Sequence, residues 1–200
     1  MSVLVGKPAP DFTAAAVTGS GEIIDNFNLA EAIKGKKAVV FFYPLDFTFV
    51  CPSELIAFDH RYQEFVDRGV VVIGVSIDSQ FSHNAWRNTD VNDGGIGAVK
   101  YPLVADVKHE ICQAYDVEHA DGVAFRGSFL IDEDGLVRHQ VVNDLPLGRN
   151  VDEMLRMVDA LNFHQEHGEV CPAGWTEGDK GMDASTAGVA AYLSENADKL

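Results

Sequence analysis

The most reactive side chains in this sequence belong to its three cysteines, and Cys51 has the setting of an activated nucleophile. It follows an apolar run over residues 38–43 and immediately precedes Pro52. Because proline is tolerated in a helix only near its start, we expect Cys51 in the first turn of a helix. Backbone N–H groups and the positive end of the helix dipole would then favour the thiolate. A lone cysteine is more commonly a small buried hydrophobe, but α/β proteins place their sites at the carboxyl ends of central strands.

The other two cysteines have different surroundings. Cys171 lies in the polar, loop-like segment 168–175, which does not predict a core position. It is either an exposed cysteine without a role or a reactive thiol. Cys112 falls on the apolar face of a predicted helix over residues 108–115, where nothing favours a thiolate. We therefore interpret Cys112 as structural.

The elements that must position these cysteines predict an α/β protein. Residues 38–43 and 70–77 are continuous apolar runs, typical of strands buried on both faces. Between them, apolar side chains recur at helical spacing from Leu55 to Val66, which predicts one amphipathic helix of about three to four turns. A strand, a helix and a strand in this order predict parallel strands joined by a right-handed crossover.

The rest of the chain continues this pattern. Ser82 is a candidate N-cap for a short helix. Residues 128–132 and 136–142 read as the two strands of a β-hairpin, with turn-forming residues between them. Asn150 and Glu153 have the spacing of a capping box at the start of a further helix.

The order of these elements predicts a thioredoxin-like α/β fold, with a mixed central sheet and helices on both faces. We assign residues 1–163 to this domain and residues 164–200 to a C-terminal extension that carries Cys171. The extension is rich in Gly, Glu, Asp and Ala, and only residues 184–197 have a weak helical pattern.

Charge and hydropathy exclude several classes of partner. The net charge is -16, with 31 acidic and 15 basic residues, so the surface should repel nucleic acid and anionic membranes. No apolar stretch approaches the roughly 20 residues that span a bilayer. The N-terminus lacks the pattern of a signal peptide. We expect a cytoplasmic protein, in which stable structural disulfides are rare.

The sequence around Cys51 resembles the active-site motif of the peroxiredoxins. The motif is Pro44-x3-Thr48-x2-Cys51, and residues 42–55, FYPLDFTFVCPSEL, resemble the typical two-cysteine branch. That branch includes thioredoxin peroxidases and the alkyl hydroperoxide reductase C subunit. The resemblance covers essentially the whole chain, through the segments GKPAPDF, FSHNAW, RGSFLID, VNDLPLGR and GEVCPAGW.

The resemblance implies a role for each residue of the motif. Cys51 would be the peroxidatic cysteine, which attacks a peroxide and becomes a sulfenic acid. Thr48 would hydrogen-bond the sulfur and the peroxide, and Pro44 would shield the pocket. Arg126 corresponds to the active-site arginine, whose charge stabilises the thiolate and the leaving oxygen.

The resemblance also implies two supporting residues, Glu54 and Arg149, which would orient Arg126 through ion pairs. From sequence position alone each of these roles has an ordinary alternative. Thr48 could be a helix cap, and the two arginines could be solvated charges at strand ends.

Cys171, in the sequence Val-Cys-Pro, resembles the resolving cysteine of the family. In the family this residue comes from the partner subunit, attacks the sulfenic acid and forms an intersubunit disulfide. The two thiols start apart, so the helical turn that holds Cys51 must unwind and the C-terminal arm must move.

The same resemblance implies partners but no metal or organic cofactor. The substrate would be a hydroperoxide, and the reductant would be thioredoxin or a dedicated flavoprotein disulfide reductase. The family forms homodimers that assemble into decamers, and residues 81–86 with the loops around Cys51 resemble the ring contacts. The loop 94–97 and the pair Tyr192-Leu193 partly match the segments that favour overoxidation of the peroxidatic cysteine.

Other readings of the sequence remain. A disulfide oxidoreductase on the same fold would require C-x-x-C at the helix start, but Glu54 occupies the second cysteine position. A holdase chaperone activity is compatible with the sequence as a second function. The histidines, including His164 and His167, form no set with metal-ligand spacing, and neither do the carboxylates of the turn 132–135.

Overall fold

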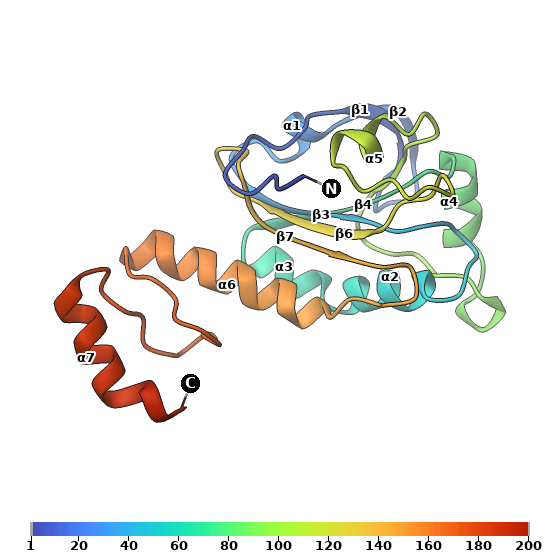
Figure 1. Cartoon of the computed structure of the whole chain (residues 1–200). Helices are drawn as coiled ribbons and strands as arrows, with labels where there is room; N and C mark the ends of the chain where they lie inside the picture. The colour runs from blue at the N-terminus through green and yellow to red at the C-terminus, as the bar shows by residue number, and fades with distance from the viewer. Residues whose placement is uncertain (1, 200) are drawn as a thin grey trace. The chain divides into compact units, whose positions relative to one another are not determined.

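The computed structural model describes residues 2–199 and consists of two compact units, which meet in sequence between Val151 and Asp152. The first unit contains the whole β-sheet, and the second contains most of helix α6 (Val151–His167) and the C-terminal residues (Figure 1). The domain boundary between residues 163 and 164 stays a prediction.

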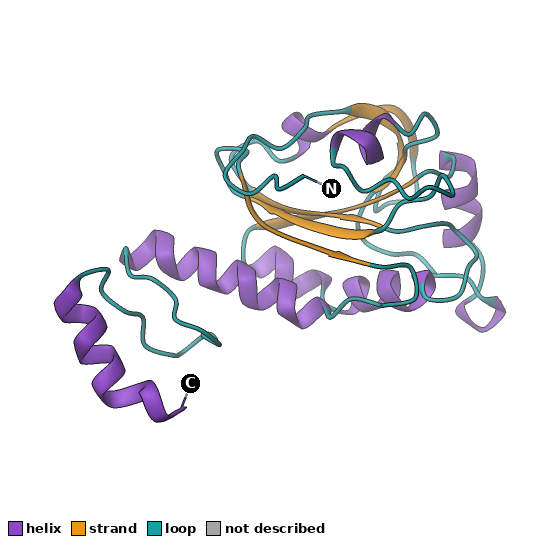
Figure 2. Ribbon diagram, viewed as in Figure 1, coloured by secondary structure: helices purple, strands orange, loops and turns teal. Residues whose placement is uncertain are grey.

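The first unit is built on one mixed sheet of seven strands, in the order β2-β1-β5-β4-β3-β6-β7 (Figures 1 and 2). The two central strands β3 and β4 are parallel, and β6 is antiparallel to both β3 and β7. This arrangement confirms the predicted parallel pair, the hairpin and the mixed sheet. The strands are β1 (Thr13–Val17), β2 (Ile23–Asn28), β3 (Lys37–Phe42), β4 (Val70–Ser76), β5 (Leu103–Ala105), β6 (Arg126–Ile131) and β7 (Val137–Asn143).

Alternate side chains of β3 pack on opposite faces of the sheet. Phe41 stacks on Phe58 of helix α2 (Cys51–His60), with ring centroids 4.1 Å apart. Phe42 faces the other way and packs against Tyr115, directly after helix α5 (Glu110–Ala114), and against Phe129 of β6. The run of apolar residues in β3 is therefore explained by burial of both faces, and helices cover both sides of the sheet.

The helices agree with the sequence analysis in position but not in every boundary. The helix predicted over residues 55–66 is in fact two helices, interrupted at Arg61, where φ and ψ are -94° and 1°. Apolar spacing does not encode this break, because the apolar faces on both sides of it remain buried. The helices are α1 (Leu29–Ala32), α2 (Cys51–His60), α3 (Tyr62–Asp67), α4 (Gln80–Arg87), α5 (Glu110–Ala114), α6 and α7 (Thr186–Asn196), with short 3-10 turns at Val91–Asp93 and Ala197–Lys199.

One predicted N-cap residue is wrong. The side chain of Ser79, not that of Ser82, caps α4, and it accepts a hydrogen bond from the backbone N–H of Ser82. Ser79 has the extended backbone that an N-cap requires, whereas Ser82 is already inside the helix. Helix α6 begins directly after Asn150, and α7 lies within the weakly helical segment that was predicted.

Strands β1, β2 and β5 have no counterpart in the sequence analysis. Strand β2 has the sequence IIDNFN, whose polar residues interrupt the alternation of a strand, and β5 is only three residues long. Their strand conformation comes from pairing with neighbours, because β1 lies between β2 and β5 and is antiparallel to both. Among the described residues, no helix is long and apolar enough to cross a membrane.

Candidate active site

Cys51 is the first residue of helix α2 and follows a loop that begins at the end of β3. Its side chain is buried, and no side chain caps the helix, whose N-cap residue is Val50. Pro52 occupies the first turn, where its missing N–H costs nothing. The predicted position at the start of a helix is therefore confirmed, and the helix dipole favours negative charge on the sulfur.

Thr48 lies one turn before Cys51 and contacts its sulfur. The Thr48 Oγ1 atom is 3.0 Å from Cys51 Sγ and 2.8 Å from the carbonyl oxygen of Leu45. A hydroxyl group has a single hydrogen, so Thr48 can donate either to the carbonyl oxygen or to the sulfur, but not to both at once. When the sulfur is a thiolate, the hydroxyl can turn its hydrogen toward that charge. Thr48 is therefore a sulfur contact and not a simple helix cap.

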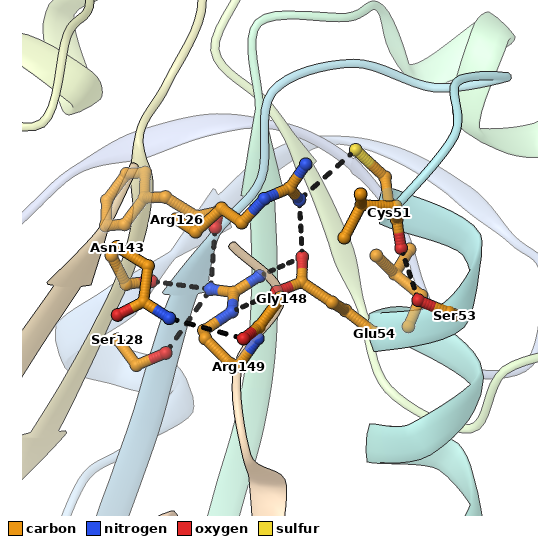
Figure 3. Close-up of polar contacts among 12 residues, drawn as sticks. Cys51, Ser53, Glu54, Arg126, Ser128, Asn143, Gly148 and Arg149 are labelled. Carbon is orange, nitrogen blue, oxygen red and sulfur yellow. Dashed lines mark hydrogen bonds and ion pairs between the residues drawn. The ribbon is translucent and has the colours of Figure 1, made fainter. Parts of the chain in front are cut away.

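Arg126 brings a positive charge to the same sulfur from the first residue of β6. Its Nη1 atom lies 3.5 Å from Cys51 Sγ and 2.6 Å from Glu54 Oε2 (Figure 3). Its Nε atom donates to the carbonyl oxygen of Leu145. The guanidinium group is thus fixed by a carboxylate on one side and a backbone carbonyl on the other.

Glu54 and Arg149 form the support for Arg126. Arg149 Nε donates to Glu54 Oε1 at 2.9 Å, and Arg149 Nη2 donates to Glu54 Oε2 at 2.8 Å, which is a bidentate pair (Figure 3). Arg149 Nη1 also donates to the carbonyl oxygens of Phe42 and Gly127. Arg149 therefore ties α2 to the ends of two neighbouring strands.

The side chains of this cluster are almost completely withdrawn from solvent, with at most 4% of each exposed. The interpretation of the two arginines as solvated strand-end charges is therefore wrong. Burial tends to raise the pKa of the Glu54 carboxyl, but the guanidinium groups, Arg149 first, outweigh this and lower that pKa below its ordinary value. One carboxylate and two guanidinium groups leave a net charge of +1, which a thiolate at Cys51 would balance.

A second buried network, which the sequence analysis missed, holds the loop before Cys51. Asp46 accepts a hydrogen bond from the hydroxyl of Tyr43 at 2.9 Å, and its other oxygen lies 2.8 Å from Nδ1 of His83. Nε2 of His83 faces the carbonyl oxygen of Val104. The only sequence signal was a pair of polar residues, one in an otherwise apolar loop and one in FSHNAW.

The loop itself is strained and partly exposed. Phe47 has a positive φ of 53°, a conformation that costs a bulky residue roughly 1–2 kcal/mol. Its ring lies 5.7 Å from that of Trp86 in α4. Pro44 is buried in the same loop, and its shielding role stays a prediction.

The remaining two cysteines have other surroundings. Cys112 is buried in α5, and burial, reinforced by the Asp106 carboxylate, raises the pKa of its thiol well above the ordinary value. Cys171 belongs to the C-terminal unit, is half-buried, and has its Sγ atom 3.4 Å from the carbonyl oxygen of Ala160. Burial raises the pKa of the Cys171 thiol, and the charge of Arg156 offsets part of that rise.

The fold thus brings four of the predicted residues, Thr48, Glu54, Arg126 and Arg149, together beside the buried sulfur of Cys51. The described residues contain no group of three or more side chains suited to a metal ion. A model of the AhpC/TSA family matches residues 5–140. The chain belongs to this family. A second model, the C-terminal domain of 1-Cys peroxiredoxin, matches residues 160–195.

Proteins with similar sequences match nearly the whole length of this AhpC/TSA protein. It is 58% identical over 198 residues to alkyl hydroperoxide reductase C of Helicobacter pylori, which covers 99% of this chain and 100% of the relative. It is 53% identical over 175 residues to peroxiredoxin-1 of Gallus gallus, which covers 87% of each chain. Proteins with these names are peroxidases, and this chain is a thiol peroxidase of the same family.

Solved structures support the same conclusion for the fold. The reduced 2-Cys peroxiredoxin of Plasmodium vivax superposes with a TM-score of 0.93 at 46% identity, covering 96% of this chain and 100% of that one. The AhpC of Enterococcus faecalis superposes with a TM-score of 0.78 at 35% identity, covering 86% and 100% of the two chains. The predicted thioredoxin-like fold of a typical two-cysteine peroxiredoxin is therefore confirmed.

Proposed function

We propose that Cys51 is the peroxidatic cysteine and reduces hydrogen peroxide and small organic hydroperoxides. The observation that carries this proposal is the pair of contacts from Thr48 Oγ1 and Arg126 Nη1 to a sulfur at the start of a helix. The thiolate sulfur bonds to the terminal peroxide oxygen, and the O–O bond breaks. The other oxygen leaves as hydroxide or alkoxide and takes up a proton, while the sulfur becomes a sulfenic acid.

Each neighbour of the sulfur has a physical role in this step. Arg126 is close enough to contact both the sulfur and an incoming peroxide, so its charge stabilises the negative charge that moves from sulfur to oxygen. The Thr48 hydroxyl orients the peroxide beside the sulfur, and Pro44 excludes water from the pocket. Glu54 and Arg149 are positioning residues, because they act by holding Arg126 in place.

We further propose that Cys171 of a partner subunit resolves the sulfenic acid. Its thiol sulfur bonds to the Cys51 sulfur, the S–OH bond breaks, and the hydroxyl group leaves as water with the thiol proton. Cys51 is only 1% exposed, so the first turn of α2 must unwind before the sulfurs can meet. The absence of a capping side chain on α2 supports such unwinding. A dithiol reductant then exchanges with the disulfide and restores both thiols.

One trapping experiment tests these assignments. Reduced wild-type protein, Cys171→Ser and Cys112→Ser are each treated with one equivalent of hydrogen peroxide and analysed by mass spectrometry and non-reducing electrophoresis. We expect a Cys51–Cys171 linked dimer in the wild type and in Cys112→Ser, because the Cys112 thiol is buried and protonated. Cys171→Ser should instead accumulate a Cys51 sulfenic acid. A disulfide that contains Cys112, or an unmodified Cys51, would refute the proposal.

The reductant is proposed as thioredoxin or a dedicated flavoprotein disulfide reductase, either of which supplies the required dithiol. Consumption of NAD(P)H with each reductant system distinguishes them. We propose the cytoplasm as the site of action, because glutathione and thioredoxin keep thiols reduced there and only reduced Cys51 reacts. The effect of loop 94–97 and Tyr192-Leu193 on overoxidation stays a prediction.

We also propose that the protein forms homodimers that assemble into a decamer. Strand β7 is the last strand at one edge of the sheet, and a contact between two such edges would form the dimer. Large apolar side chains are exposed on the loop around Cys51 and on α4: Phe47 is 52% exposed, Phe49 96% and Phe81 67%. Exposed apolar side chains of this size are typical of an interaction surface, and they support a contact between dimers.

The decamer leads to a prediction for Phe81. Phe81→Asp should convert the reduced decamer into dimers, because a carboxylate at a buried contact is desolvated without a partner. Val66→Asp is the matched control, since Val66 is also exposed but belongs to α3 and not to α4 or the Cys51 loop. Sedimentation velocity in reducing buffer measures the change. A Phe81→Asp protein that remains decameric would contradict the assigned surface.

A further inference from the structure

Asp46, in the loop between β3 and α2, and His83 of α4 form a buried polar pair to which the proposed reaction gives no role. Their side chains are 1% and 0% exposed, and Asp46 Oδ2 lies 2.8 Å from Nδ1 of His83. The carbonyl oxygen of Val104 can only accept a hydrogen bond, so Nε2 of His83, 3.2 Å away, carries a hydrogen. Nδ1 and the carboxylate share a further hydrogen. A pair buried this completely contributes little net stability, so its place beside the Cys51 loop points to another role.

The pair belongs to a network that fixes the loop on both sides of Leu45. Tyr43, which directly follows β3, donates its hydroxyl hydrogen to Asp46 Oδ1 at 2.9 Å. The backbone N–H of Asp46 donates to Asp78 Oδ2 at 2.8 Å, and that oxygen also accepts from Ser76 Oγ at the end of β4. The chain before and after Leu45 is therefore tied to the central strands of the sheet.

The carbonyl group of Leu45 connects this network to the sulfur. It accepts from Thr48 Oγ1 at 2.8 Å, and the same hydroxyl lies 3.0 Å from Cys51 Sγ. The turn that brings Thr48 back to Leu45 includes Phe47, whose positive φ of 53° persists only while its surroundings hold it. Asp46 directly precedes Phe47 and supplies three hydrogen bonds that do so. Loss of its side-chain bonds would let the turn relax and displace the Thr48 hydroxyl.

We propose that Asp46 and His83 are positioning residues for the reaction of Cys51 with peroxide. Their hydrogen bonds hold the loop so that the Leu45 carbonyl keeps the Thr48 hydroxyl beside the sulfur, where its hydrogen can turn toward the thiolate. This inference rests on the proposed roles of Cys51 and Thr48, and it adds the residues that determine where the hydroxyl of Thr48 lies.

Two variants separate the hydrogen bonds of the pair from its charge. The apolar double variant Asp46→Leu/His83→Phe replaces the pair by side chains of similar size, a change that commonly preserves stability. Asp46→Asn keeps every bond, because its amide can donate to Nδ1 of a neutral His83 while its oxygen accepts from Tyr43. In stopped-flow oxidation by hydrogen peroxide, the apolar double variant should react about 10- to 100-fold more slowly than the wild type, the effect of losing a hydrogen bond to a charged group. Asp46→Asn should react at nearly the wild-type rate.

A Thr48→Val background shows whether the effect passes through Thr48. Valine keeps the shape of threonine and removes the hydroxyl. If the pair acts by positioning this hydroxyl, the apolar double variant should not slow a Thr48→Val protein further, because residues that act as one unit have non-additive effects. An equal slowing in both backgrounds would show general damage to the site and overturn the inference.

Asp132→Leu is the matched control for structural damage. Asp132 is also buried, at 2% exposed, and accepts hydrogen bonds from the backbone N–H groups of Asp134 and Leu136 in the turn between β6 and β7. Asp132→Leu should unfold at a lower urea concentration than the wild type and still react at the wild-type rate. A wild-type rate in the apolar double variant, or an Asp46→Asn protein as slow as that variant, would overturn the inference and leave the role of Cys51 intact. A wild-type protein whose Cys51 does not react with peroxide would overturn both.

Discussion

Replacing Arg126 with methionine should slow the reaction of Cys51 with hydrogen peroxide about 100- to 1000-fold, the usual effect of removing one preorganised donor at a developing charge. Arg126 supplies the only positive charge that directly contacts the Cys51 sulfur among the described residues, at 3.5 Å. Without it, neither the thiolate nor the departing oxygen has a fixed cation beside it. Stopped-flow tryptophan fluorescence of the reduced protein gives the rate constant directly.

Two further variants serve as controls for this experiment. Arg138→Met removes an arginine from strand β7, where it pairs with Asp132 and is 37% exposed, so its rate should stay near that of the wild type. Arg126→Lys retains the charge but not the fork that bonds both Glu54 and Leu145, and its rate should be intermediate. An Arg126→Met protein that is folded and reacts at the wild-type rate would show that this charge has no part in the chemistry.

Glu54→Gln should reduce the free energy of unfolding by about 3–5 kcal/mol at neutral pH, the usual cost of removing one partner of a buried ion pair. The amide has nearly the same shape as the carboxylate, so packing is preserved. Two buried guanidinium groups, of Arg126 and Arg149, nevertheless lose the carboxylate with which both are paired. Urea unfolding measures the loss. Glu64→Gln is the control, because Glu64 is 48% exposed and should contribute about 0.5 kcal/mol or less.

The pH dependence of this difference has a defined sign. The pKa of the Glu54 carboxyl is lower in the folded protein than its ordinary value of 4.5. The stability from its ionised form is therefore fully present above that ordinary value, which applies to the unfolded chain, and is lost as the pH falls through the lowered folded value. The gap between wild type and Glu54→Gln should thus be constant from pH 7 to pH 6 and shrink below about pH 4. A gap that widens on acidification would contradict the assignment.

The sequence alone could predict those parts of the site that are determined by residues adjacent in the chain. Pro52 indicates a helix start wherever it lies in the fold, so the position of Cys51 followed from the sequence alone. Arg126 and Arg149 reach Glu54 from 72 and 95 positions away, a distance at which residue spacing carries no information. Only the resemblance to a family pointed to them, and only the coordinates show that they are buried.

The features that the sequence analysis missed also depend on contacts between residues that are distant in the chain. The bond between Asp46 and His83 joins two polar residues that each look like surface residues in their own segment. Strand β2 owes its conformation to pairing with β1, because its own sequence is too polar to indicate a strand. The hydroxyl of Tyr115 looked like one more residue on an apolar helix face. That this hydroxyl has no hydrogen-bond partner among the described residues can be seen only from the three-dimensional structure, which places all the groups around it.

The charge balance around Cys51 has a consequence for the order of events in each turnover. While the sulfur is a thiolate, it neutralises the net +1 of Glu54, Arg126 and Arg149, and this attraction holds the first turn of α2 in place. A sulfenic acid is uncharged, so oxidation removes the attraction and leaves an uncompensated positive charge in a dry environment. In the cycle proposed above, the product state would therefore loosen the segment that confined the reactant, and release of Cys51 toward Cys171 would follow the oxidation without any external signal.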